Sequence, residues 1–96
     1  MDRAAALHLL KAHKAVLAER FGVARLALFG STARDTAGPD SDVDVLVAFD
    51  GPAMSERYFG AQFYLEDLLD RNVDLVTEKA LRERLRPCVE RDAIAV

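Results

Sequence analysis

The sequence lacks the features that would direct a chain to a membrane or to an oxidising compartment. No apolar run approaches the roughly 20 residues that a membrane-spanning helix needs. The N-terminus does not resemble a signal peptide, because Asp2 and Arg3 lead into a mixed segment that contains His and Lys. A single cysteine, Cys88, cannot form an internal disulfide, which is typical of the reducing cytoplasm. We interpret Cys88 as a partly buried small side chain in preference to a catalytic thiol.

Positive charge is also in short supply. Lys and Arg total 13 against 16 Asp and Glu, a net charge of −3. This balance argues against non-specific binding of nucleic acid, which depends on neutralising phosphates. Apolar residues, in contrast, make up 51% of the 96 residues. The composition therefore predicts one small globular domain, residues 1–96, with a single hydrophobic core and no internal repeat or linker.

The periodicity of the apolar residues predicts a small mixed β-sheet flanked by helices, an α/β (α+β) fold. We predict helices over residues 2–20, 55–70 and 78–86, a further helical turn to residue 92, and strands over residues 25–29, 42–50, 72–77 and 93–96. Gly22 is expected to end the first helix, Ser55 to cap the second, and Pro87 to interrupt the last. His8 and His13 are interpreted as solvated helix residues.

The second long helix carries an apolar stripe, and the last region carries a basic cluster. We expect the aromatic residues of the stripe to lie in the core, and not to form a base-stacking platform. They include Tyr58, Phe59 and Phe63. The basic cluster is interpreted first as a solvated face, with a role in holding a triphosphate or an acidic partner as the alternative. Its members are Arg82, Arg84, Arg86 and Arg91.

The most informative stretch runs from residue 29 to residue 47 and reads FGSTARDTAGPDSDVDVLV. Asp42 and Asp44 point to the same face of a predicted strand, about 7 Å apart along it. Two carboxylates side by side repel each other and are costly to desolvate, so we expect a cation between them. Mg²⁺ and Mn²⁺, which prefer oxygen ligands, are the natural candidates.

The other end of this stretch has the features of a phosphate site. Gly30 has no Cβ, so a phosphate can approach the backbone closely. Ser31 is a favoured N-cap, and the free N–H groups of a helical turn over residues 32–34 would bind anions. Phosphate at one end and metal at the other is the layout of a site for a nucleoside triphosphate with Mg²⁺.

Asp74 would complete such a site. It interrupts an otherwise apolar strand, where an unpaired buried carboxylate would be costly. Placed beside Asp42 and Asp44, it would give three carboxylates, which can hold two divalent ions roughly 3.5–4 Å apart. A salt bridge to an arginine is the alternative for Asp74 taken alone.

Two other motifs are excluded by their missing residues. Residues 40–51 imitate an EF-hand loop, but Val45 replaces the Gly of the sixth position and Gly51 replaces the Glu of the twelfth. The turn at Gly30 lacks the Gly-Lys-Ser/Thr ending of a Walker loop, which excludes an ordinary P-loop.

The whole arrangement resembles the signature of the DNA polymerase beta-like nucleotidyltransferase superfamily. Its parts are Gly30-Ser31, ten intervening residues, Asp42-Val43-Asp44 and an aliphatic run. The residues around this signature are most similar to the minimal nucleotidyltransferase (MNT) group, namely Ala33-Arg34 and Pro39-Asp40-Ser41. The similarity to this group covers nearly the whole chain. The pattern is moderately specific, because it requires the flanking strands as well as the residue types of the motif.

The resemblance implies a role for each matching residue. Catalysis and the binding of two Mg²⁺ ions (or Mn²⁺) would fall to Asp42, Asp44 and Asp74, with Asp74 near the incoming nucleophile. The nucleotide would be bound by Gly30, Ser31, Arg34 and Ser41. The substrate would be ATP, from which AMP is transferred to a hydroxyl group.

The chain departs from the family pattern at Asp35, where relatives commonly have Gly. Asp tolerates the left-handed conformation better than most residues, so we expect the turn to survive. The extra negative charge would weaken nucleotide binding.

Two classes of function remain open. In the first, the chain is an antitoxin enzyme that transfers AMP to a tyrosine hydroxyl of a partner HEPN toxin, with which it would form a hetero-oligomer. In the second, the chain masks the toxin by direct binding without catalysis. The presence of three carboxylates and Gly30-Ser31 favours the enzyme, because a masking protein has no physical need for them. A small-molecule (antibiotic) nucleotidyltransferase is less well supported, because it usually needs a further domain to hold the acceptor.

Overall fold

Four strands form one mixed sheet in the computed structural model, which describes residues 1–52, 54–81 and 86–96. The strands are β1 (Val23–Phe29), β2 (Val43–Phe49), β3 (Val73–Thr77) and β4 (Ile94–Ala95), in the order β3-β2-β1-β4. β1 pairs antiparallel with both β2 and β4, whereas β2 and β3 are parallel. Parallel pairing is possible there because a helix connects the two strands. The predicted mixed sheet, with the aliphatic second strand in its interior, is confirmed.

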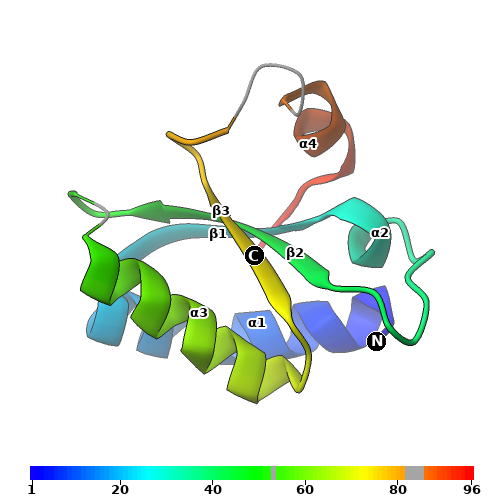
Figure 1. The fold of residues 1–96 in the computed structure, drawn as a ribbon, viewed down its shortest axis with the longest axis horizontal. Coiled ribbons are helices and arrows are strands. Elements are labelled where there is room, and N and C mark those ends of the chain that lie inside the picture. The colour runs from blue at the N-terminus through cyan, green and yellow to red at the C-terminus, as the bar shows by residue number, and fades with distance from the viewer. Residues whose placement is uncertain (53, 82–85) are drawn as a thin grey trace.

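The helices lie on both sides of this sheet. They are α1 (Arg3–Phe21), α2 (Gly30–Ala33), α3 (Ser55–Leu69) and α4 (Arg86–Asp92). Figure 1 shows α1 and α3 side by side beneath the sheet, while α4 lies above it, on the opposite side. Within the described ranges, none of these helices combines the length and the apolar character needed to cross a membrane.

The hydrophobic core lies between the sheet and the layer formed by α1 and α3. Val43, Val45 and Val47 are at most 1% exposed, as the alternation along the predicted strand requires. The side chains that meet them from the helices include Leu10, Leu17, Ala61, Leu65 and Leu69. Because one face of β2 is committed to the core, the side chains between these valines point to the other face, which carries the candidate site.

The ends of α1 follow from its sequence. The Asp2 side chain accepts a hydrogen bond from the backbone N–H of Ala5 at 2.7 Å, so Asp2 is the N-cap and the helix begins one residue later than predicted. Gly22 ends the helix in the left-handed conformation, as predicted. Asp35 is also left-handed, with φ 63°, which confirms the expectation for this turn. Its carboxylate accepts a hydrogen bond from the backbone N–H of Arg3.

Three predictions about helix ends are wrong. Ser55 is the first residue of α3 and Met54 stands at the N-cap, with no side-chain cap. Residues 78–80 form a turn and residue 81 is not helical, residues 82–85 lie outside the described residues, and Arg86, the last residue of that predicted helix, is the first residue of α4. Pro87 does not interrupt a helix, because it sits in the first turn of α4, where a backbone N–H has no partner to lose.

The expected environment of several side chains is also corrected. His13 is partly buried, and its Nδ1 lies 2.6 Å from the hydroxyl of Tyr64. Phe59 and Phe63 are 50% and 62% exposed and are not core residues. Each precedes a buried residue of α3 by two positions, and two residues turn a helix by about 200°, so both face outward. The predictions for Arg82, Arg84 and the Cys88 side chain fall outside the described residues.

Candidate active site

The predicted site lies where β1 ends and β2 and β3 begin. The strand register pairs Asp44 with Phe29 on one side and with Asp74 on the other. Residues paired in this way share one face of the sheet, and this face points away from the α1–α3 layer. Asp44 and Asp74 are therefore direct neighbours across two parallel strands, and Gly30 follows Phe29 at the same end.

The three acidic residues differ in burial. Asp44 is partly buried, whereas Asp42, which precedes β2, and Asp74 are both exposed. The expectation that Asp74 is buried is wrong, because β3 is an edge strand and its face at this end is open. Its predicted position beside the second strand is correct. Position in the sheet, and not the cost of burial, is what distinguishes Asp74.

The electrostatics of the site centre on Asp44. Partial burial, and then the negative charges of Asp74 and Asp42, raise the pKa of Asp44 from 3.8 to about 6. Arg34 acts in the opposite direction, so its guanidinium also lies close enough to affect this carboxylate. The site thus holds one carboxylate whose ionisation is opposed by its neighbours, and a divalent cation would relieve that opposition.

Gly30 joins the phosphate half of the site to the metal half. Its φ is +73°, and a Cβ added to it would lie 2.0 Å from Oδ2 of Asp44. The Asp44 carboxylate therefore packs against the backbone at a position where only glycine fits. Ser31 is the second residue of α2 and not its N-cap, since Phe29 occupies that position without a side-chain hydrogen bond. The prediction of a short helical turn is confirmed, and the capping role of Ser31 is wrong.

Arg34 is held by a residue that the sequence did not reveal. Its Nη1 lies 2.6 Å from Oδ2 of Asp92 in α4, and Nε of Arg91 lies 3.2 Å from the other oxygen. The Asp92 side chain is only 6% exposed, and both arginines lower its pKa. Asp92 directly follows Arg91 in the sequence, which was the available signal, but no pattern linked it to Arg34, 58 residues away. Ser41 accepts a hydrogen bond from Gly38 and orders the loop before β2.

The fit of the site to a divalent metal rests on the chemistry of its donors. Oxygen ligands from carboxylates suit Mg²⁺ and Mn²⁺. Partial burial first, and then the charges of Asp74 and Asp42, raise the pKa of Asp44, and a bound cation would offset these effects. Across the described residues, no group of three or more His, Cys, Asp or Glu side chains is arranged so that it could hold a metal ion. The fold nevertheless brings Asp42, Asp44 and Asp74 to one end of the sheet, and their joint binding of a metal ion stays a prediction.

Comparison with known proteins agrees with this geometry. The nucleotidyltransferase domain family matches residues 10–95. The chain belongs to this family. It is 41% identical over 88 residues to the protein adenylyltransferase MntA of Thermococcus cleftensis, covering 92% of this chain and 89% of that relative. The resemblance to minimal nucleotidyltransferases is confirmed, and the chain is a nucleotidyltransferase.

Two solved structures extend the comparison. One, described provisionally as a minimal nucleotidyltransferase, gives a TM-score of 0.83 at 38% identity and covers 100% of this chain and 97% of its own. A chain from a Shewanella oneidensis structure of a tri-AMPylated HEPN toxin in complex with an MNT antitoxin gives 0.65 at 21% identity. That match covers 93% of this chain and 68% of the other, and it shows a shared fold alone.

The raised pKa of Asp44 predicts a pH-dependent gain in stability for Asp44→Asn. The pKa of Asp44 is higher in the folded state than in the unfolded state, so the folded state binds this proton more tightly. The free energy of unfolding therefore falls as pH rises through about 4 to 6, where the proton is lost. A shift from 3.8 to about 6 corresponds to at most about 3 kcal/mol, and solvent screening of this partly exposed group reduces it to about 1 kcal/mol. Metal-free Asp44→Asn should therefore unfold at higher urea than wild type at pH 7.5, and at equal urea at pH 3.5. A lower midpoint at pH 7.5 would contradict the assignment.

Proposed function

We propose that this chain transfers AMP from ATP to a hydroxyl group of a partner protein, and that the partner is a HEPN-type toxin that the transfer silences. One observation carries the proposal: the strand register sets Asp44 beside Asp74, and Gly30 packs against Asp44 from the end of β1. A nucleotide phosphate and an acceptor hydroxyl would meet at this point. We further propose that residues 1–96 act as one catalytic domain in the cytoplasm, in a hetero-oligomer with the toxin.

Relatives support the choice of acceptor. The Thermococcus cleftensis relative is named a protein adenylyltransferase, which identifies a protein as its acceptor. The Shewanella oneidensis structure pairs an MNT antitoxin with an AMPylated HEPN toxin. A tyrosine hydroxyl as the acceptor atom in this chain's partner rests on the family resemblance.

In the proposed reaction, the acceptor oxygen attacks the α-phosphorus of ATP. A new oxygen–phosphorus bond forms, the bond to the β-phosphate oxygen breaks, and pyrophosphate leaves with its electron pair. Asp74, which is exposed beside the acceptor's approach, takes the proton of the hydroxyl. Gly30 and Ser31 approach the triphosphate through their backbone, Ser41 keeps the loop before β2 in place, and Arg34 stabilises the leaving phosphates.

Asp42, Asp44 and Asp74 would hold the Mg²⁺ ions of this reaction. When bound, the metal neutralises the triphosphate and makes the acceptor hydroxyl more acidic. The contribution of the chain is to set three carboxylates at one end of a rigid sheet. Asp44, the most buried of them, is fixed by its packing against Gly30.

The test of the proposal is the mass of the partner. The chain is incubated with Mg-ATP and the purified HEPN protein encoded beside it, and the partner is measured by intact-protein mass spectrometry. We expect the partner to gain the mass of one or more AMP groups. Full inhibition of the toxin with no change in its mass would overturn the transferase and leave a masking antitoxin.

The ion pair between Arg34 and Asp92 predicts a specific kinetic defect. Asp92 contacts only Nη1 of Arg34, which leaves the other donors of the guanidinium for phosphate. Without this anchor the side chain loses its orientation, so Asp92→Asn should raise KM for ATP by about three- to tenfold with little change in kcat. Asp92→Glu should restore KM in part. A KM below that of wild type would show instead that Asp92 competes with the triphosphate for Arg34.

A further inference from the structure

The outward side of α3 carries an apolar surface that the core does not use. Among the described residues, the exposed large apolar side chains are Met54, Phe59 and Phe63, at 64%, 50% and 62% exposure. The rings of Phe59 and Phe63 stack with their centroids 6.4 Å apart, one helical turn from each other. We call Phe59 and Phe63 the apolar ridge. A cluster of this kind on a small domain marks a surface that another molecule covers.

A hollow connects the ridge to the face of the sheet that carries the active site. It has a volume of about 450 Å³ and is lined by Ser55, Tyr58, Phe59, Leu75, Val76, Thr77 and Ala80. Leu75 faces the core, whereas Val76 is on the same face as Asp74, two residues before it. The hollow therefore crosses the edge of β3, and Val76 is a lining residue on the face of the sheet that carries the carboxylates, although none of the three carboxylates lines it. A molecule seated on the ridge can extend through the hollow to that face of the sheet.

Side chains of α3 occupy part of the edge of β3. The Tyr58 hydroxyl donates to the carbonyl of Leu75, and Gln62 Nε2 donates to the carbonyl of Val73 at 3.2 Å. The backbone N–H of Val73 donates in turn to Glu66 at 3.1 Å. Side chains four residues apart on α3 thus occupy both outward backbone groups of Val73 and the carbonyl of Leu75. Because these groups are taken, an added β-strand would find no continuous row of partners at this part of the edge, and side-chain contacts are favoured for docking.

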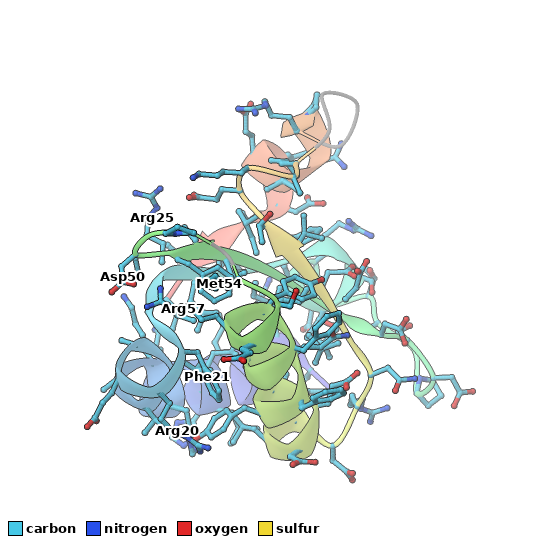
Figure 2. The ribbon with its side chains drawn as sticks, turned by 60° about the vertical axis from the view of Figure 1, so that its left-hand side comes forward. Arg20, Phe21, Arg25, Asp50, Met54 and Arg57 are labelled. Atoms are coloured by element: carbon cyan, nitrogen blue, oxygen red, sulfur yellow. The ribbon has the colours of Figure 1, made fainter. Side chains whose placement is uncertain are left out.

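Acidic residues lie at both ends of the ridge. Glu56 precedes Phe59 by three positions and Asp67 follows Phe63 by four, so all four side chains lie on one stripe of α3. Glu56 and Asp67 are exposed. The neighbouring Arg57 points away to Asp50, with Nη1 2.9 Å from Oδ1, and Figure 2 shows this pair turned toward each other beside the first turn of α3. The ridge is therefore complementary to an apolar surface flanked by Lys or Arg.

We propose that the acceptor protein docks on the apolar ridge through a helix with an apolar stripe and basic side chains at its ends. Two helices pack by fitting such stripes together, and the stacked Phe59 and Phe63 would form the centre of the contact. A partner docked there lies along the hollow and brings a hydroxyl over the edge of β3 to Asp74. This proposal rests on the proposed function for the identity of the partner.

The test replaces the ridge by polar residues of similar helix propensity. Phe59→Gln/Phe63→Gln is compared with wild type and with a control on the exposed side of α1, Lys11→Gln/Glu19→Gln. Binding to the HEPN protein encoded beside this chain is measured by calorimetry without ATP. We expect the ridge variant to raise Kd at least about tenfold and the control to leave it unchanged. Glu56→Lys/Asp67→Lys should also weaken binding, because it places positive charge against a basic partner.

Each outcome of this experiment bears on the proposal separately from the transferase reaction. The thermal shift caused by Mg-ATP should be the same in the ridge variant and in wild type, which shows that the variant is folded and binds nucleotide. Unchanged Kd in the ridge variant would overturn the proposal. Light scattering that shows a dimer for wild type and a monomer for the ridge variant, with Kd unchanged, would also overturn it, because a second copy of this chain would then cover the ridge. If wild type transfers no AMP but the ridge variant still loses binding, the docking surface is supported and the transferase reaction is excluded.

Discussion

Asp74→Asn is expected to reduce the rate of AMP transfer by about 10²- to 10⁴-fold, the range typical for loss of a group that accepts a proton in the transition state. The loss should appear mainly in kcat, because Asp74 is exposed and contributes little to the core. Asp44→Asn should have an effect at least as large, since Asp44 lies between Phe29 and Asp74 in the strand register and contacts Gly30. The measurement is the rate of AMP incorporation into the partner by mass spectrometry.

Two controls make this prediction specific. Neither substitution removes a buried apolar group, so both variants should remain folded and should bind the partner with nearly wild-type affinity. Mg-ATP should raise the melting temperature of wild type by ordinary ligand linkage, and this rise should be lost in Asp42→Asn/Asp44→Asn. Equal responses of wild type and the double variant to Mg-ATP would place the nucleotide site elsewhere. Neutralisation of the toxin by Asp44→Asn and Asp74→Asn as complete as that by wild type would favour masking.

Gly30→Ala is expected to remove activity and to destabilise the fold at the same time. The left-handed φ of +73° alone costs an alanine roughly 1–2 kcal/mol. In addition, the new Cβ would lie 2.0 Å from Oδ2 of Asp44, so either the carboxylate or the backbone must move. We expect a loss of about 2 kcal/mol or more in the free energy of unfolding, measured in urea, together with loss of the Mg-ATP thermal shift.

Gly38→Ala provides the matched control for this substitution. A Cβ at Gly38 would find only Oγ of Ser41, at 3.7 Å, which is an ordinary van der Waals contact. Its effect on stability should therefore stay within about 0.5 kcal/mol, as for most surface substitutions. If Gly30→Ala behaves like Gly38→Ala in both stability and nucleotide binding, the contact between Gly30 and Asp44 has no role in the site.

Local pattern in the sequence was sufficient for the elements that carry the site. The alternation of valine and aspartate from Asp42 to Val47 predicted a strand with one apolar and one acidic face, and Val43, Val45 and Val47 are indeed buried. At Gly30 the sequence predicted that a phosphate can approach the backbone, and this stays a prediction; in the structure the group that lies close to this backbone is the Asp44 carboxylate. The inference about the strand succeeds because the period of a strand is a local property.

Inferences that depended on solvent exposure were less successful. Asp74 was singled out for the cost of burying it, yet it is exposed. Phe59 and Phe63 were assigned to the core as part of the apolar stripe of their helix, yet they face outward. Which side of a helix or strand is covered depends on what packs against it, and a single segment carries no information about its neighbours.

The sequence by itself determined the kind of chemistry: two carboxylates on one strand face, a third on another strand, and a glycine turn where a phosphate can approach. The tertiary structure decided which of these groups meet. The strand register sets Asp44 between Phe29 and Asp74, and the position of α4 brings Asp92 to Arg34 across 58 residues of sequence. Such contacts depend on strand order and helix packing, which arise from the whole core and not from any one motif. For the same reason, only the structure shows that the apolar ridge of α3 lies beside the edge strand that carries Asp74.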